Sequence, residues 1–109
     1  MPSVEDLRKF VEMSPADPFP RYGLAMQLKS EGALEQSIAA FAELCAKFPT
    51  YVAGHQQMGL ALAQAGRLDE ARAAYTAGIE AAKKTGNRHA AEEMQGALEA
   101  LGDTLPPSK

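Results

Sequence analysis

The sequence lacks several features that mark particular classes of protein. It has no tryptophan, a single cysteine (Cys45) and only 6% aromatic residues. One cysteine excludes an intrachain disulfide and is typical of a protein in a reducing compartment. Alanine, leucine and glutamate are abundant instead, and these side chains, which are not branched at Cβ, lose little rotamer freedom in a helix. The composition therefore favours an all-α fold.

The sequence also lacks a strong charge excess and a long apolar run. Its net charge is −3 at pH 7, whereas a protein that follows a phosphate backbone carries a basic patch or stripe. No apolar stretch approaches the roughly 18 residues that span a bilayer. The first residues, MPSVEDLRKF, include acidic residues early and contain no apolar segment of the kind found in a signal peptide. We therefore expect no nucleic-acid partner, no membrane partner and a cytoplasmic location.

What the sequence does contain is an internal repeat. Eight positions have a chemically similar counterpart further along the chain, always at the same interval. The pairs are Pro15 and Pro49, Leu24 and Met58, Leu28 and Leu62, Gly32 and Gly66, Leu34 and Leu68, Glu35 and Asp69, Ser37 and Ala71, and Phe41 and Tyr75. This period of about 34 residues is typical of stacked helix-turn-helix repeats. The length of 109 residues fits one domain built from such a stack.

Proline, glycine and the apolar periodicity divide the chain into six expected helices. Asp17 and Pro18 open the second helix as N-cap and first helical residue. Gly32 and Gly66 end the second and fourth helices, because glycine readily adopts the positive φ found just past a helix. The expected helices span residues 4–13, 18–31, 34–47, 52–65, 68–84 and 88–101, and a disordered tail is expected over 103–109.

The repeated residues resemble the tetratricopeptide repeat family, whose pattern combines W-x2-L-G-x2-Y, A-x3-F and a closing proline. The first full repeat, about 18–51, supplies Leu24-Ala25, Leu28, Gly32, Ser37, Phe41 and Pro49, and the second, about 52–85, supplies Met58-Gly59, Leu62, Gly66, Ala71 and Tyr75. Arg21 and His55 stand at the tryptophan position, and Lys83 replaces the second closing proline. The missing proline permits a longer fifth helix, expected over 68–84.

The resemblance implies a right-handed helical solenoid over residues 1–102. Half a repeat would come first, then the two full repeats, and then helix 87–101 as a C-terminal cap. Terminal half-repeats of this kind cover the ends of a stacked core.

In this family the first helix of each repeat lines a concave face that binds peptides or helices. The resemblance therefore implies a non-enzymatic interaction module, a scaffold or adaptor, whose partner is a protein or peptide. The implied partner-binding residues are Phe19, Tyr22, Met26, Lys29, Gln56, Gln57, Leu60, Ala63 and Met94, with Gly23, Ala90 and Ala91 on the same face. Two readings of the apolar members remain open, namely partner contact and internal packing. A homodimer whose groove holds a second copy is the alternative to an outside partner.

The sequence offers little for chemistry. Cys45 with His55 or His89 is the candidate thiol–imidazole pair. Cys45 lies on an apolar helix face, however, and His55 stands at a packing position of the repeat. Two histidines and one cysteine without ligand spacing form no metal cluster. Some family members hold a C-terminal carboxylate with basic and asparagine residues, and Lys29 alone cannot replace that set. We therefore expect no catalytic residue, no metal and no cofactor.

Overall fold

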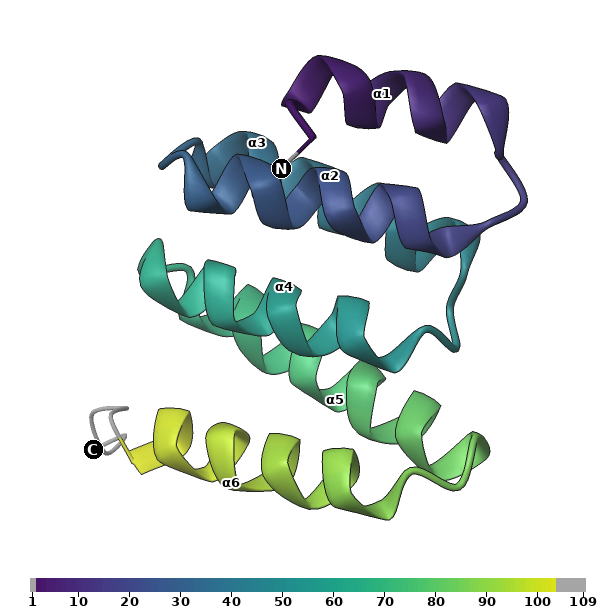
Figure 1. Cartoon of the computed structure of the whole chain (residues 1–109). Coiled ribbons are helices and arrows are strands. Elements are labelled where there is room, and N and C mark those ends of the chain that lie inside the picture. Colours follow the sequence, from purple (N-terminus) through teal and green to yellow (C-terminus); the bar gives the residue numbers. More distant parts are fainter. Residues whose placement is uncertain (1, 104–109) are drawn as a thin grey trace.

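The structure, a computed structural model, describes residues 2–103 and shows six helices over that range (Figure 1). They are α1 (Val4–Met13), α2 (Pro18–Ser30), α3 (Leu34–Lys47), α4 (Val52–Gln64), α5 (Leu68–Lys84) and α6 (Arg88–Asp103). Each helix packs against the next one in the chain. In Figure 1, α2, α4 and α6 lie in front, with α3 and α5 behind α2 and α4. Among residues 2–103, no helix combines the length and apolar character needed to cross a bilayer.

The helix ends follow from local capping chemistry. The Asp17 carboxylate accepts the Phe19 amide N–H at 3.0 Å, directly before Pro18 at the first position of α2. Gly32 and Gly66 adopt φ values of 82° and 78°, which glycine reaches without steric cost. In both turns the following amide donates back to the helix, as Ala33 N–H does to the Leu28 carbonyl at 2.9 Å. The expected helix ends are therefore confirmed to within two residues.

The C-terminal helix departs from the expectation. Gly102 was predicted to stop it, but α6 includes Gly102 and ends at Asp103. Asp103 is thus helical rather than part of a tail. The rest of the predicted disordered tail, residues 104–109, lies outside the described residues.

The repeat period lengthens at the last helix. Val52 follows Pro18 by one regular period, but the interval from Val52 to Arg88 is longer by two residues. The cause is α5, which has 17 residues against 14 in α3, while the connection that follows α5 is one residue shorter than the one that follows α3. No proline ends α5, so it continues until the turn at Gly86 (φ 74°). The predicted longer fifth helix is confirmed, and it shifts α6 by two residues relative to the repeat.

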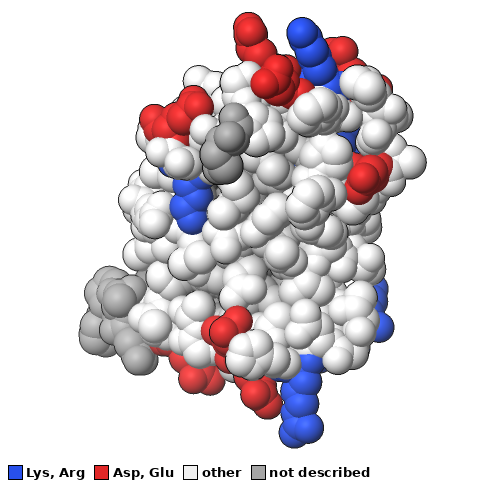
Figure 2. Space-filling model, viewed as in Figure 1, with Lys and Arg blue, Asp and Glu red and all other residues white. Residues whose placement is uncertain are grey.

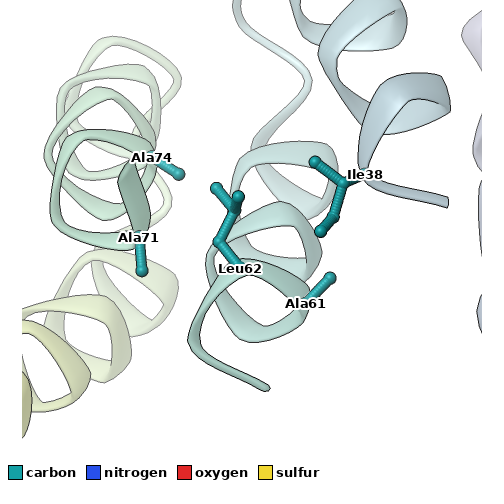
Figure 3. Close-up of a cluster of buried hydrophobic side chains, with 5 residues drawn as sticks. All are labelled: Ile38, Ala61, Leu62, Ala71 and Ala74. Carbon is teal, nitrogen blue, oxygen red and sulfur yellow. The ribbon is translucent and has the colours of Figure 1, made fainter. Parts of the chain in front are cut away.

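The core lies between the front helices and the two helices behind them. Figure 3 shows Leu62 of α4 lying between Ile38 of α3 and the alanines Ala71 and Ala74 of α5. Glycine at position 59 allows α4 and α5 to approach closely, because a Cβ there would lie 2.6 Å from the ring of Tyr75. Gly59 belongs to the repeated pair Met58-Gly59, so a repeat residue permits this close contact.

Candidate functional site

The predicted site residues of α2 and α4 lie on one continuous surface, which we call the α2–α4 face. Its members are Phe19, Tyr22, Met26 and Lys29 of α2, and Gln56, Gln57, Leu60 and Ala63 of α4. The Lys29 ammonium donates to the Gln57 amide oxygen at 3.2 Å, which joins the two helices across this face. Figure 2 shows that the middle of the surface over α2 and α4 carries no Lys, Arg, Asp or Glu, and that charged residues gather at its margins.

The apolar members of the α2–α4 face divide into exposed and packed side chains. Phe19 is 68% exposed and Leu60 is 40% exposed. Tyr22 is half-buried and meets Phe41 and Tyr51 edge-on, at ring-centroid distances of 6.3 and 5.6 Å. Burial raises the pKa of the Tyr22 hydroxyl, which therefore stays neutral. Tyr22 thus has a packing role in the core, whereas the exposed side chains of Phe19 and Leu60 are accessible to a partner.

Met26 and Ala63 are also half-buried. Met26 packs against the cluster that contains Phe41 and Leu44. Ala63 packs against the cluster of Ile38 and Leu62. Both residues are therefore partly packed on the core and partly accessible on the α2–α4 face.

The polar members are held by single hydrogen bonds. Gln56 donates to the Glu93 carboxylate of α6 at 3.2 Å, and the His89 imidazole lies 3.2 Å from the same carboxylate group. The Gln56–Glu93 hydrogen bond therefore links the exposed sides of α4 and α6. Because Lys29 is already bonded to Gln57, the surface presents no group of convergent cations for an anionic partner.

Met94 was predicted at the partner-binding surface, and the structure places it in the core. It is fully buried and packs with Tyr75 and Ile79. The reason is the two-residue shift of α6. Once that shift is counted, Met94 takes the inward helix position of Met58 and Leu24.

The same shift displaces the neighbouring predictions on α6. Ala90 is buried, and Ala91 packs against the core cluster of Tyr75 and Met94. The α6 residues equivalent to Gln56, Gln57 and Leu60 are Glu92, Glu93 and Gly96. The surface is therefore acidic, and not apolar, where it reaches α6.

Two exposed apolar residues were missed by the sequence analysis. Phe10 is 44% exposed and Met13 is 76% exposed, and both lie on α1. With Phe19 they line a hollow of about 360 Å³ between α1 and α2, which we call the terminal hollow. Its lining residues are Pro2, Leu7, Phe10, Met13, Ser14, Phe19, Pro20 and Gly23. The sequence signal was available, since α1 is the second half of a repeat whose first half is not among the six helices.

The candidate reactive residues Cys45, His55 and His89 each have a different structural environment. Burial raises the pKa of the Cys45 thiol to about 11, so the thiolate is disfavoured at neutral pH. The buried His55 donates from Nε2 to the Pro49 carbonyl at 2.7 Å and ties α4 to the preceding loop. His89 is exposed beside Glu93. Over the described part of the chain, no three His, Cys, Asp or Glu side chains converge as metal ligands would. These groups support the fold, and the surfaces offer contacts for binding.

No protein-family model matches the sequence, and no curated protein matches it. Solved structures do. The crystal structure of a tetratricopeptide repeat domain protein from Salinibacter ruber is 30% identical with a TM-score of 0.76, and the match covers 82% of this chain and 99% of that one. A solution NMR structure of a tetratricopeptide repeat domain protein from the same organism is 29% identical with a TM-score of 0.81, over 87% and 96% of the two chains.

A third structure, a protein from Bordetella parapertussis, is 21% identical with a TM-score of 0.75, over 92% of this chain and 87% of that one. At that identity the likeness concerns the fold alone. Together the six helices and these likenesses define an all-α helical-repeat solenoid. More narrowly, the chain belongs to the tetratricopeptide repeat family and is a repeat module of the protein-interaction type.

Proposed function

We propose that the α2–α4 face binds the apolar side of a short amphipathic segment of a partner protein. The observation that carries the proposal is the 40% exposure of Leu60 on α4. The middle of the surface over α2 and α4 carries no charged residue (Figure 2). A single exposed leucine is ordinary. Leu60, however, takes on α4 the helix position that Met26 takes on α2, and Phe19 extends the apolar surface to the start of α2. Aligned apolar residues on neighbouring helices suit helix-in-groove recognition.

The polar members support the same proposal. Lys29, Gln56 and Gln57 are held by single side-chain hydrogen bonds at the margin of the apolar residues. Such bonds exchange readily with polar groups of a partner, because one hydrogen bond replaces another. The apolar residues would then supply affinity, and the amides would orient the bound segment. A scaffold or adaptor role, and a cytoplasmic site that agrees with the unpaired Cys45, belong to this proposal.

The test uses Leu60→Glu. Full burial of a leucine contributes about 1.5–3 kcal/mol, so burying the 40% that is exposed contributes about 0.6–1.2 kcal/mol to binding. A carboxylate in the same contact adds a desolvation penalty. Peptides selected from a displayed random library on the full-length chain should therefore bind the variant about tenfold more weakly or worse. Tyr22 is a poorer site for such a test, since its ring packs on Phe41 and Tyr51.

Phe10→Glu is the matched control, because it places the same charge on an exposed apolar residue outside the α2–α4 face. Circular dichroism and thermal unfolding establish that both variants are folded. If the selected peptides bind folded Leu60→Glu as tightly as the wild type, the α2–α4 face is not the binding surface. If light scattering shows a concentration-dependent dimer that Leu60→Glu abolishes, the face binds a second copy instead of a partner.

A further inference from the structure

The three front helices present different chemistry at equivalent positions. Four positions of α2 and α4 have counterparts on α6 once the two-residue shift of α6 is counted. In the order α2, α4 and α6, they are Tyr22, Gln56 and Glu92; Gly23, Gln57 and Glu93; Met26, Leu60 and Gly96; and Lys29, Ala63 and Glu99. The surface therefore changes from largely apolar on α2, through amides and apolar residues on α4, to carboxylates on α6. In Figure 2, acidic side chains lie over α6, below the uncharged middle of the surface.

Three carboxylates of α6 surround a glycine. Gly96 follows Glu92 by four residues and Glu93 by three, and Glu99 follows Gly96 by three. Residues at these spacings are neighbours on the surface of a helix. A Cβ on Gly96 would meet no heavy atom within 4 Å, so the space beside this residue is open. We call these four residues the α6 acidic patch.

The carboxylates of the α6 acidic patch can accept further hydrogen bonds. Their present contacts are Arg88–Glu92 at 3.3 Å, Gln56–Glu93 and His89–Glu93 at 3.2 Å, and Gln95–Glu99 at 3.2 Å. Each ionised carboxylate has about four acceptor positions, and the side chains of Glu92 and Glu93 are 68% and 51% exposed. Exposed pairs of this kind contribute little to stability. A cationic partner can therefore add to these contacts or replace them.

We propose that the partner segment bound by the α2–α4 face is basic as well as amphipathic, and that one of its arginines lies over Gly96 and pairs with the α6 acidic patch. This inference rests on the proposed function and specifies the chemistry of the partner. The aliphatic stem of arginine can lie along the helix surface while its charged end stays in water. Its guanidinium has five donors in a fixed geometry, so it can pair with two carboxylates, whereas lysine offers a compact point charge.

The separation of the front helices sets the spacing of residues in the partner. The Gln56–Glu93 hydrogen bond shows that α4 and α6 lie side by side at this surface. Packed helices lie about 8–10 Å apart, and a helix that crosses them rises about 1.5 Å per residue. Contacts with successive front helices are therefore about five to seven residues apart in a helical partner. The arginine should stand at that distance from the apolar residue that packs on Leu60.

A second copy of this chain is a poor source of the basic segment. Both copies would carry a net charge of −3 and repel each other. Outside the α2–α4 face, the large apolar side chains exposed among residues 2–103 are Phe10 and Met13 of α1. That helix has three acidic residues and two basic ones, namely Glu5, Asp6 and Glu12 against Arg8 and Lys9. It would bring net negative charge to the α6 acidic patch, so charge complementarity favours a basic partner over a second copy.

The probes are peptides selected from a displayed random library on the full-length chain at low ionic strength. We expect the selected sequences to be enriched in arginine about five to seven residues from a large apolar residue. The tightest of them is synthesised and titrated into the protein. The double variant Glu92→Gln/Glu93→Gln, which keeps the side-chain size and removes two charges, should bind it about three- to tenfold more weakly. Glu99→Gln repeats the test at the third carboxylate, should the double variant lower the melting temperature.

Glu43→Gln/Glu80→Gln is the matched control. It changes the net charge by the same amount, but at exposed residues of α3 and α5, behind the front helices. We expect its affinity to stay within about twofold of the wild type. A peptide whose arginine is replaced by glutamine should bind the wild type about three- to tenfold more weakly, and Glu92→Gln/Glu93→Gln should then cost it little more. Raising the salt concentration from about 0.05 M to about 0.5 M should reduce the effect of both changes.

The outcomes separate this inference from the proposed function. If Leu60→Glu weakens binding and Glu92→Gln/Glu93→Gln does not, the inference is wrong and the proposed function stands. Binding that neither variant weakens, or a selection that yields no peptide, overturns both. Selected peptides without basic residues overturn the inference, as does an equal loss in Glu43→Gln/Glu80→Gln. A concentration-dependent dimer that excludes the peptides makes a second copy the occupant.

Discussion

The contact between Gly59 of α4 and Tyr75 of α5 gives the sharpest prediction from the packing. A Cβ at position 59 would lie 2.6, 2.7 and 2.8 Å from three ring carbons of Tyr75. The ring is 2% exposed, so it has little room to move aside. Overpacking of this kind costs about 1–3 kcal/mol, whereas replacing glycine by alanine within a helix contributes up to about 1 kcal/mol of stability. Gly59→Ala should therefore lower the free energy of unfolding by about 1–2 kcal/mol.

Gly96→Ala is the matched control for this change. Gly96 lies within α6, and a Cβ there would meet no heavy atom within 4 Å. Only the helix-propensity gain applies, so this variant should be more stable than the wild type by about 0.5–1 kcal/mol. Urea unfolding followed by circular dichroism measures both variants. In a domain of this size, a change of about 1 kcal/mol corresponds to roughly 4–8 °C in melting temperature.

A double-mutant cycle identifies the cause of the destabilisation. Tyr75→Leu removes the ring that the new methyl group would meet, so the penalty of Gly59→Ala should shrink or vanish in that background. If Gly59→Ala raises stability as Gly96→Ala does, the close approach of α4 and α5 is not a constraint. If the penalty is the same with and without the Tyr75 ring, steric contact is not its cause.

Three further predictions concern local interactions. The Cys45 thiol, whose pKa burial raises to about 11, should react with a thiol reagent only slowly in the native protein and rapidly in urea; equal rates would contradict its burial. Asp17→Ala removes the side chain that caps α2 and should lower the free energy of unfolding by about 1 kcal/mol in urea titrations. Arg67 lowers the pKa of Glu70 through a side-chain hydrogen bond. The contact therefore stabilises the fold at pH values above the usual pKa of a carboxyl group, and this stabilisation is lost as the pH falls through the lowered pKa. The stability difference between Arg67→Ala and the wild type should therefore narrow in acid, and a pH-independent difference would refute this assignment.

Most of the fold could be predicted from the sequence because each interior position occurs in both full repeats, so two residues indicate the same helix face. Phe41 and Tyr75 are equivalent, and both are buried behind the helix that precedes them. The turns at Gly32 and Gly66 are equivalent in the same way. Where two full repeats agree, the repeat period suffices to place a helix and its inward face.

The errors arise where the period changes. The expected bounds of the fifth helix, 68–84, and the expected start of the sixth at residue 88 agree with the structure. The surface positions of α4 were nevertheless carried onto α6 at the 34-residue period, and the two extra residues rotate a helix position by about 200°. Met94 was therefore predicted at the surface and lies in the core, while Glu93 takes the outward position. A residue's side of a helix depends on the preceding turn, which periodicity alone does not fix.

The hollows at the two ends of the described stack differ in the chemistry of their lining. At the α6 end, a hollow of about 430 Å³ is lined in part by Lys83, Arg88 and Glu92, so charged side chains accompany its apolar floor. An end exposed to water needs such a polar surface. At the α1 end, no charged side chain lines the hollow, and Phe10 and Met13 are exposed instead. The described α6 end therefore has the polar surface that this requirement demands, whereas the described α1 end exposes apolar side chains.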